Sequence, residues 1–505
     1  MLFQESEPIA LGRRAVMLLR LLVERAGTPV SKDALMQAAW PGLAVEESNL
    51  TVQIAALRRI FAEVDGGATW IETLPRRGYR YVGPPVVTAE SGADLPTSPA
   101  HAASDRPSLA VLPFSNLSGD PAQDYFSDGI TGDIIAELSR FRSLFVVARH
   151  SSFAYRGRSA EIKRVGRELG VRYVAEGSVR KIGSRVRVTV QLLDAGSGYN
   201  LWTERYDREL ENIFSLQDEI VRAIVAALPG RLEDAGRETA RRKRTSSITA
   251  YDLVLLGNAR WRQLTMKGMA EAREYFRNAV ALDPQYARAH VNIAWTIVCD
   301  VFLESPATAT LDEALREIET ALDIDDGDAW SHGVFAQLLF LRNEDAKAEI
   351  HFSRALALNP NDADVAAVFA NILVYWGRWR EALTRIGAAK RLNPFPPNLY
   401  HWYHALALYS GHEYERAVKA LMEARSLDRW SHGLLAACYA QMGRLGEARF
   451  EAEAFVRERS RELNENGDAL PANTLDLAQA RAGRYRDPAD REHFLDGLRR
   501  AGLTG

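Results

Sequence analysis

The sequence predicts a multidomain chain in which three fold classes follow one another. Residues 1–83 contain three helical patterns and then two short strands, which is an α+β arrangement. Residues 108–230 alternate strands and helices and predict an α/β layered domain. From residue 250 onward a helix-pair motif recurs at nearly constant intervals, which predicts an all-α superhelix.

Composition restricts the classes of function that are open to the chain. A length of 505 residues exceeds what one hydrophobic core supports, and the net charge of -3 means that any nucleic-acid-binding surface is local. The two cysteines, Cys299 and Cys438, stand alone in helical segments and indicate neither disulfides nor a thiolate metal site. We see no secretory signal and no apolar run of the ~18 residues that a membrane span needs, so we expect a cytoplasmic protein.

Two helical segments open the first module. Residues 11–27 form an amphipathic pattern that stops at Gly27, and residues 31–40 begin at the cap residue Ser31 and end before Pro41. Three leucines share the apolar face of the first segment: Leu18, Leu19 and Leu22.

The third helical segment, residues 47–61, has two faces of different character. Four apolar side chains fall within ~40° of one another at 100° per residue and must pack inward. The opposite face carries small and apolar residues where a solvated helix would carry Glu and Lys. Such a face suits the DNA major groove, because short side chains let the backbone approach and methyl groups meet thymine methyls. From this face alone, a helix buried on two sides explains the pattern equally well. The inward-facing residues are Leu50, Ile54, Leu57 and Phe61.

The stretch WIETLPRRGYRYVG, residues 70–83, predicts a β-hairpin after the three helices. Alternation along its second strand places Tyr79 and Tyr81 on one side and Arg80 on the other, with residues 76–78 at the tip. Two of the tip residues are arginines, and positive charge at this place suits a phosphate backbone or the adjoining minor groove. Three helices followed by a hairpin make a winged helix.

Three motifs in order carry a family resemblance: LLRLLVERAGTPVSKDALMQAAWPG, SNLTVQIAALRRIF and IETLPRRGYRYVG. Residues 9–83 closely resemble the effector domain of OmpR- and CadC-type transcriptional regulators. The resemblance implies that the third helix enters the major groove and that the wing contacts the adjoining minor groove. That domain normally begins with a four-stranded sheet, whereas residues 1–10, MLFQESEPIA, are long enough for one short strand or part of a hairpin. A truncated start is therefore an alternative that the sequence leaves open. The membrane helix of CadC-like members and the receiver domain of OmpR-like members have no counterpart here.

We therefore expect residues 1–83 to be a winged helix-turn-helix DNA-binding domain of the OmpR/PhoB type. Base reading is assigned to the third helix, and phosphate contacts to arginines of that helix and of the wing. The expected base-reading residues are Ser48, Thr51, Val52, Ala55 and Arg59, and the expected phosphate-binding residues are Arg58, Arg76 and Arg77.

Residues 84–107 are rich in Pro, Ala and Ser and predict a flexible linker. Residues 108–230 follow in the order β-α-β-α-β-β-β-α, with a tight turn at Gly183 and Ser184. Between Glu137 and Val190, 13 basic residues stand against 4 acidic ones, for which a solvated surface is a simpler interpretation than an anion, nucleic-acid or acidic-partner site. The segment resembles the TolB amino-terminal-like module of bacterial regulators and nucleotide cyclases, a resemblance that implies no ligand.

The motifs AVALDP, ALDIDD, ALALNP, AKRLNP and ARSLDR begin 42, 34, 34 and 35 residues apart. Because 34 residues is the tetratricopeptide period, and glycines at 377, 411 and 443 supply turn signals, residues 250–460 resemble that family. The resemblance implies a superhelix with a concave surface for a protein or small-molecule partner. Residues 461–505 are expected to form a C-terminal tail similar to those of repeat-bearing cyclases.

We find no catalytic constellation: phosphate loops, HExxH and nucleophile-elbow patterns are all missing from the sequence. His401 and His404 lie one helical turn apart, but without a third ligand nearby their packing in the repeat is the simpler interpretation. We expect no enzyme, cofactor or metal.

The sequence thus predicts a one-component transcriptional regulator that binds double-stranded DNA and acts in signal transduction. The α/β module and the repeats would sense a ligand or bind a protein, without a membrane and with a homodimer left open. The alternative is a non-enzymatic tetratricopeptide scaffold whose winged helix no longer binds DNA.

Overall fold

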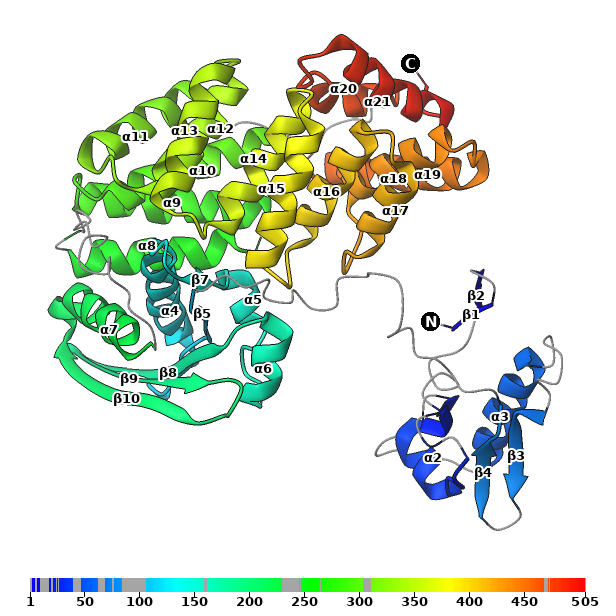
Figure 1. Cartoon of the computed structure of the whole chain (residues 1–505). Coiled ribbons are helices and arrows are strands. Elements are labelled where there is room, and N and C mark those ends of the chain that lie inside the picture. The colour runs from blue at the N-terminus through cyan, green and yellow to red at the C-terminus, as the bar shows by residue number, and fades with distance from the viewer. Residues whose placement is uncertain are drawn as a thin grey trace. The chain divides into compact units, whose positions relative to one another are not determined.

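The computed structural model divides the chain into two compact units, Met1–Thr97 and Ser98–Gly505, and each is described by itself (Figure 1). The structure describes residues 2–4, 7–9, 18–19, 21–23, 25, 27–39, 47–61, 69–74, 77–83, 106–158, 161–228, 245, 247–263, 265–302, 310–466, 471 and 473–504. Most of the expected linker, residues 84–105, lies outside this set.

The first unit has the elements of a winged helix, as the sequence predicts. A short antiparallel hairpin precedes the helices, which agrees with the expectation of part of a hairpin. The helices end at a second antiparallel hairpin, the wing. The described elements are β1 (Leu2–Gln4), β2 (Glu7–Ile9), α2 (Lys32–Ala39), α3 (Glu47–Phe61), β3 (Ile71–Leu74) and β4 (Gly78–Tyr81).

The core of the first unit consists of the side chains that the helical patterns place inward. The three leucines of the first segment and the four apolar residues of α3 are all buried. They pack with Tyr79 and Tyr81 of the wing, while Arg80 points the other way and pairs with Glu72 at 2.7 Å. Ser31 caps α2 by accepting a hydrogen bond from the Ala34 amide at 3.2 Å. The predicted inward faces of the first segment, of α3 and of the second wing strand are therefore confirmed.

Backbone hydrogen bonds hold the wing against the segment before α2. Val30 and Tyr79 exchange two bonds, of 2.8 and 3.0 Å, and the Gly27 amide donates to the Tyr81 carbonyl at 2.9 Å. Gly78 makes this approach possible: its φ is +107°, and a Cβ there would lie 2.0 Å from the Val30 carbonyl oxygen. Gly78, which we expected at the wing tip, instead starts β4 and contacts the segment before α2.

The second unit begins with an α/β layer built on a mixed sheet of strand order β10-β9-β8-β5-β7. Strand β8 is parallel to β5 and antiparallel to β9, and Gly183 turns between β8 and β9 with a φ of +57°. The elements are β5 (Ser108–Val111), β6 (Ser115–Asn116), α4 (Asp124–Ser139), β7 (Phe145–Val146), α5 (Arg149–Phe153), α6 (Ile162–Leu169), β8 (Tyr173–Ile182), β9 (Arg185–Asp194), β10 (Asn200–Glu209) and α7 (Ile213–Ala227).

Helices cover both faces of this sheet. One face packs against α4 and α7 through the inward-facing residues of β9, which are Val186, Val188, Val190 and Leu192 as predicted. The other face packs against α6 and the residues after α5 through a smaller cluster that includes Val147, Tyr155 and Val165. Arg185 and Arg187 of β9 are exposed, in agreement with the predicted alternation.

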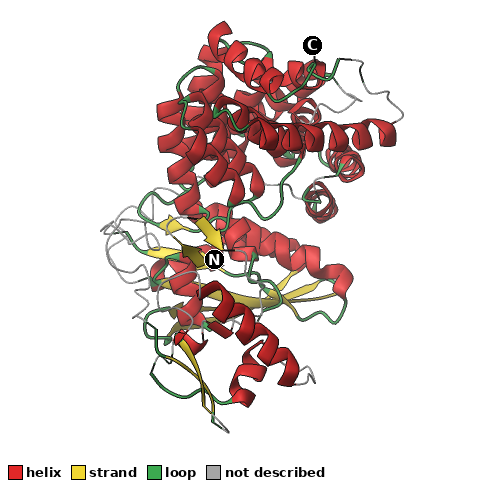
Figure 2. Cartoon of the chain, turned by 90° about the vertical axis from the view of Figure 1, so that its right-hand side faces the viewer, coloured by secondary structure: helices red, strands yellow, loops and turns green. Residues whose placement is uncertain are grey.

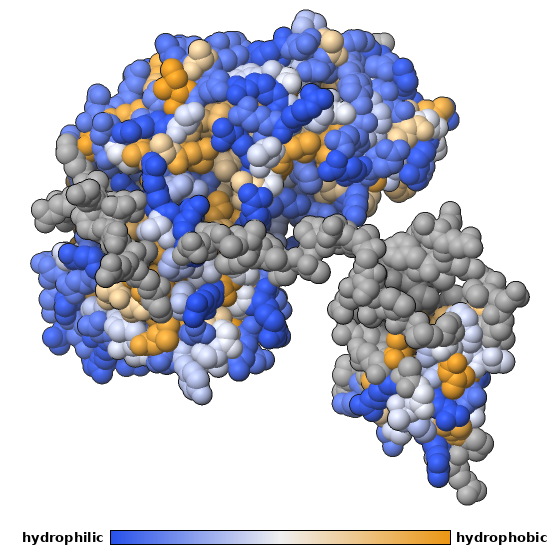
Figure 3. Space-filling model, in the orientation of Figure 1, coloured by the Kyte–Doolittle hydropathy of each residue, from blue (hydrophilic) through white to orange (hydrophobic). Residues whose placement is uncertain are grey.

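Six helical hairpins stacked side by side make up the described repeats (Figures 1 and 2). Each recurring motif found in the sequence falls at or just after the end of the second helix of a hairpin, so the predicted repeat is confirmed. The visible surface of this unit is mostly hydrophilic, with apolar residues in small groups (Figure 3). The helices are α8 (Ile248–Trp261), α9 (Met266–Leu282), α10 (Ala287–Phe302), α11 (Leu311–Ile324), α12 (Ala329–Leu341), α13 (Asp345–Leu358), α14 (Ala363–Tyr375), α15 (Trp379–Leu392), α16 (Asn398–Ser410), α17 (Tyr414–Met422), α18 (Arg429–Gln441) and α19 (Leu445–Asn466).

One of the three expected turn glycines does not have the left-handed backbone conformation. Gly377 and Gly443 have left-handed φ values of +75° and +76°, as turn glycines do. Gly411 does not, because its neighbour His412 takes the left-handed conformation with a φ of 61°. Asn343 has the same role in an earlier hairpin, with a φ of 63°.

The loops between hairpins bind the α/β layer, which explains why the two predicted domains, 108–230 and 250–460, form one unit. The buried Asn361 amide donates to the carbonyls of Ser139 at 2.9 Å and Leu144 at 3.2 Å. The Ser151 hydroxyl donates to the buried Asn393 at 2.5 Å, and the Ala148 amide donates to the Leu392 carbonyl at 2.8 Å. Asn361 directly follows the motif ALALNP and Asn393 lies within the motif AKRLNP, so the loops at the ends of the repeats supply the docking groups.

The described part of residues 461–505, which we expected to form a tail, packs against the repeats. Helix α19 continues to Asn466, and α20 (Asp476–Ala482) and α21 (Pro488–Arg500) follow. The Arg481 guanidinium lies 3.8 Å from the ring centre of Trp430 and 4.6 Å from that of Trp402. Phe494 is buried in the same core as the hairpins. The segment therefore closes the stack, because the last hairpin of a repeat array has no further neighbour to cover it.

Replacing Gly78 with Ala is expected to destabilise the wing by about 2 kcal/mol or more, because the new Cβ meets the Val30 carbonyl and the backbone is left-handed. Hydrogen exchange of amides 71–81 in the full chain measures the loss. Gly27→Ala is the matched control, since Gly27 is also left-handed but has open space around it; it should cost about 1 kcal/mol. Equal effects of the two changes would contradict the close contact with Val30.

Replacing Asn361 with Ala is expected to lower the unfolding free energy of the second unit by about 2 to 4 kcal/mol, because several buried carbonyls lose their donor. Denaturant unfolding of the full chain measures it. Thr384→Ala, which removes an exposed hydroxyl bonded within its own helix, serves as control and should change stability by less than about 0.5 kcal/mol. A similar small change for Asn361→Ala would show that the docking contact is unimportant.

Candidate DNA-binding interface and a pocket in the second unit

The outward face of α3 is exposed at the positions where its side chains are described. Thr51 and Ala55 are exposed, whereas the apolar residues of the opposite face are buried. A helix buried on two sides would bury both residues, so the structure favours an accessible face. The side chains of Ser48, Val52 and Arg59 lie outside the described residues, although their backbone is helical.

Arg58 has a different environment from the one that the sequence suggested. Its Nε and Nη2 donate to the Ile71 carbonyl oxygen at 3.0 and 2.6 Å, and Nη2 also donates to the Thr73 hydroxyl at 2.7 Å. These bonds tie α3 to the first strand of the wing. We therefore revise the expected role: Arg58 positions the wing, because much of its hydrogen-bonding capacity is already used inside the domain.

The tip of the wing is described only in part. Arg77 is exposed, and its amide closes the turn by donating to the Leu74 carbonyl at 3.0 Å. Arg76 lies outside the described residues. Ring contacts of Phe61 with Trp70, at 5.2 Å, and with Tyr81, at 6.5 Å, join the end of α3 to the base of the wing. The wing and the exposed face of α3 are thus fixed to each other within one domain.

The contact of Arg58 with the wing was not predicted, because the local sequence does not distinguish Arg58 from its neighbour Arg59. Only the position of the strand 13 residues away decides that Arg58 reaches the wing. A usable signal does exist: Arg58 follows Leu57 of the buried face, so its side chain starts at the border of the core.

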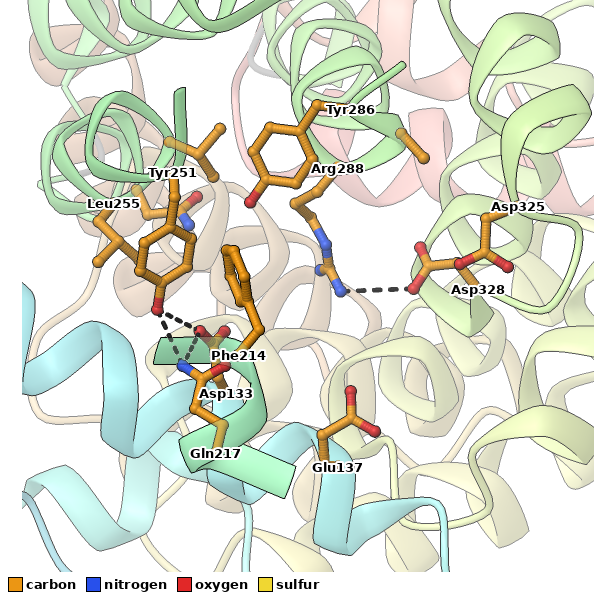
Figure 4. Close-up of a pocket in the computed structure, with 13 residues that line it drawn as sticks. Asp133, Glu137, Phe214, Gln217, Tyr251, Leu255, Tyr286, Arg288, Asp325 and Asp328 are labelled. Atoms are coloured by element: carbon orange, nitrogen blue, oxygen red, sulfur yellow. Dashed lines mark hydrogen bonds and ion pairs between the residues drawn. The ribbon is translucent and has the colours of Figure 1, made fainter. Parts of the chain in front are cut away.

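A pocket of about 80 Å³, partly open to solvent, lies in the second unit between the α/β layer and the first hairpins (Figure 4). Asp133 of α4 lies at one end and accepts hydrogen bonds from the Tyr251 hydroxyl at 2.6 Å and the Gln217 amide at 3.0 Å. At the other end, Arg288 pairs with Asp328 at 3.3 Å. These polar groups are already bonded to one another, so the pocket can hold water but is not preformed for a cofactor.

The candidate histidine pair packs within the repeats. The Nδ1 of His401 lies 3.4 Å from a Glu423 carboxylate oxygen, and burial lowers the pKa of His404 to about 4. A neutral, buried imidazole fits the packing interpretation. Within the described ranges, no group of three or more His, Cys, Asp and Glu side chains is arranged to hold a metal ion. Among the same residues, no helix is both long and apolar enough to cross a bilayer.

Two segments of the chain match known protein families. Residues 6–81 match the family described as "Transcriptional regulatory protein, C terminal". This match confirms the OmpR-type winged helix that the sequence predicts. Residues 104–223 match the family described as "HilA/YgeH-like transcriptional regulator, second domain", so the α/β layer is similar to the second domain of other transcriptional regulators.

Curated relatives agree with this combination. The chain is 24% identical to the transcriptional regulator HilA of Salmonella typhimurium over 402 residues, which are 78% of this chain and 68% of that protein. It is 43% identical over 260 residues to putative adenylate cyclase 3 of Rhizobium meliloti, a match that spans 51% of this chain but only 43% of that protein. The cholera toxin transcriptional activator of Vibrio cholerae is 30% identical over 79 residues, which are 15% of this chain and 27% of that protein.

Solved structures similar to the chain include a tetratricopeptide repeat protein from Parabacteroides merdae. It is 16% identical, the match covers 50% of this chain and 93% of that one, and the TM-score is 0.32. The structure titled as a functional characterisation of Pseudomonas aeruginosa pilF is 19% identical and covers 41% of this chain and 91% of that one, with a TM-score of 0.32. The assignment of the repeats rests on the stacked hairpins described above and not on these low scores.

We expect Arg58→Ala to loosen the wing in the absence of DNA, because three hydrogen bonds to β3 are lost. Hydrogen exchange of amides 71–74 should speed up about tenfold. Arg77→Ala, at the exposed wing tip, is the control and should leave exchange unchanged. Unchanged exchange in Arg58→Ala would return Arg58 to the set of phosphate ligands.

Proposed function

We propose that the chain is a one-component transcriptional regulator whose α3 reads the DNA major groove while the wing grips the adjacent backbone. The observation that carries the proposal is the exposed face of α3 held beside an arginine-bearing hairpin, in a domain that matches a transcriptional regulatory family. Small side chains such as Ala55 permit close approach to base edges, and cationic wing residues bind phosphates without reading sequence.

The residues proposed to contact DNA are those that the sequence pattern places on the outward face of α3 and at the wing tip. Base reading is assigned to the outward positions of α3, and phosphate binding to the wing tip. Arg58 is omitted because it holds the wing in place. The proposed base-reading residues are Ser48, Thr51, Val52, Ala55 and Arg59, and the proposed phosphate ligands are Arg76 and Arg77.

The second unit is proposed to be the effector part. Its α/β layer and repeats form one body, so a partner that binds the repeats also acts on the α/β layer. The C-terminal segment already contacts Trp402 and Trp430, which leaves the remaining repeat surface for a protein or small-molecule partner. Since the proposed target is chromosomal DNA, the site of action is the cytoplasm.

We propose that the chain acts without catalysis, although one relative is named a putative adenylate cyclase. The match spans less than half of that protein, and the described residues show no metal-binding carboxylate cluster. Cyclic AMP formation by the purified full chain with ATP and Mg²⁺ tests this directly. Turnover above a no-protein blank would overturn the proposal.

Replacing Arg59 with Ala is expected to cost about 1 to 3 kcal/mol of DNA affinity and to relax base preference at one position. The measurement is gel retardation of the full chain on fragments recovered by genome-wide mapping of bound sites, compared with single-base variants of those fragments. Arg316→Ala, an exposed arginine of the repeats, is the matched control and should bind as the parent does.

Replacing Arg76 with Ala should weaken binding nearly equally on all sequences and lower the slope of log affinity against log salt by about 1. Titration of the full chain at several salt concentrations gives the slope. If neither Arg59→Ala nor Arg76→Ala alters affinity for a genuine site, the scaffold alternative, in which the winged helix does not bind DNA, becomes the better account.

A further inference from the structure

Strand β10 forms one edge of the mixed sheet and is long and exposed for a strand in that position. It stands first in the strand order β10-β9-β8-β5-β7, so a neighbouring strand pairs with only one of its sides (Figure 1). It runs for ten residues, and all of its side chains except those of Trp202 and Tyr206 are exposed. An exposed strand edge of this length offers a row of backbone groups to a further strand.

The register with β9 decides which residues of β10 direct their backbone groups outward. The Leu210 amide, just after β10, donates to the Ser184 carbonyl at 2.5 Å, so this facing pair is hydrogen-bonded. The register continues without a shift from Trp202 to Glu209. Because hydrogen-bonded pairs alternate along an antiparallel ladder, the even-numbered residues of β10 bond to β9 and the odd-numbered residues face away from it. The outward backbone groups belong to Thr203, Arg205, Asp207 and Glu209.

The charges of β10 have opposite signs at equal distances from Tyr206. The segment reads Glu204, Arg205, Tyr206, Asp207, Arg208. When two copies of the strand run antiparallel about Tyr206, Arg205 of each copy faces Asp207 of the other, and Glu204 faces Arg208. Outward residues must face outward residues, so the twofold axis of such a pair passes through a residue position. An axis at any of the charged positions sets that charge against itself, whereas the axis at Tyr206 creates no like-charge pair.

The ion pairs that these charged groups form within one chain are exposed. Asp207 binds Arg187 at 2.6 Å and Arg205 at 3.1 Å. Arg208 binds Glu219 of α7 at 2.7 Å and also donates to the Asp207 carbonyl at 3.0 Å. Pairs as exposed as these add little to the stability of the single chain. Since a carboxylate accepts and a guanidinium donates several hydrogen bonds, each group can take a second partner without losing the first.

We propose that β10 pairs with β10 of a second copy of this chain, antiparallel about Tyr206, so that the two sheets join into one. The outward amides and carbonyls of Arg205 and Asp207 then bond to those of the other copy, and opposite-charge pairs lie across the junction on both faces of the joined sheet. Charges on an edge strand commonly prevent pairing with other strands. In β10 the same charges disfavour the neighbouring registers and favour this one, which selects a second copy as the partner.

The pairing has a consequence for DNA binding, and this consequence rests on the proposed function. A dimer joined through β10 carries two winged helices, and a regulator with two DNA-binding domains reads two half-sites on one duplex. Simultaneous binding of both domains raises the overall affinity above that of one domain. The pairing of β10 itself does not involve DNA, so it is measured with DNA absent.

Sedimentation of the purified full chain over a range of concentrations measures the dissociation constant of the dimer. We expect a reversible dimer that weakens as the salt concentration rises, because exposed charge pairs are screened. Arg205→Asp places a carboxylate opposite Asp207, and Asp207→Arg places a guanidinium opposite Arg205. Each variant alone should dimerise about tenfold or more weakly than the parent, since like charges then meet at the junction.

A mixture of the two variants tests the register itself. In a mixed dimer the introduced carboxylate of one copy faces the introduced guanidinium of the other, and the remaining Asp207 faces the remaining Arg205. The equimolar mixture should therefore regain the dimer of the parent. Arg316→Asp, at an exposed arginine of the repeats, is the control and should dimerise as the parent does.

Three results would overturn the pairing of β10: a parent that sediments as a monomer at all concentrations, single variants that dimerise as the parent does, or a mixture that dimerises no more tightly than the single variants. DNA binding of the Arg59 and Arg76 variants is measured separately. Failure of the dimer therefore leaves the DNA-binding proposal standing, and failure of DNA binding leaves the dimer standing.

Discussion

The architecture of the second unit depends on one constraint: polar groups that are buried where the α/β layer meets the repeats must find hydrogen-bond partners inside the protein. The end of α4 and the start of β7 present carbonyl groups to the loops between hairpins, and Asn361 supplies the donor that they need. Ser151 and Asn393 do the same at the next loop. Because unpaired groups at these places would cost about 1 to 3 kcal/mol each, the contact fixes how the layer sits on the helices.

The same constraint acts in the winged helix, where it places the wing. The hairpin could in principle swing about its connection to α3. Backbone bonds to Gly27 and Val30 from one side and the Arg58 guanidinium from the other remove that freedom. A DNA-binding domain benefits from such a fixed wing, because a preorganised surface loses less conformational entropy when it binds.

The sequence by itself determined every feature that depends on local periodicity. The inward face of α3, the alternation of Tyr79 and Arg80 in the wing and the 34-residue repeat were all predictable, since side-chain direction follows from helix and strand geometry. The kind of candidate site, a DNA-binding winged helix, was also predictable, because the three winged-helix motifs occur in order. The individual residues of the site were less predictable. Thr51 and Ala55 are exposed as expected, whereas Arg58 donates hydrogen bonds to the first strand of the wing.

Only the tertiary structure decided which distant groups meet. Asn361 and Ser139 are 222 residues apart, and nothing in their local patterns distinguishes a docking asparagine from a solvated one. The left-handed turn at His412 in place of Gly411 and the packing of α20 and α21 against the repeats are of the same kind. Each depends on long-range packing and on the hydrogen-bond partners that it brings together, which periodicity does not encode.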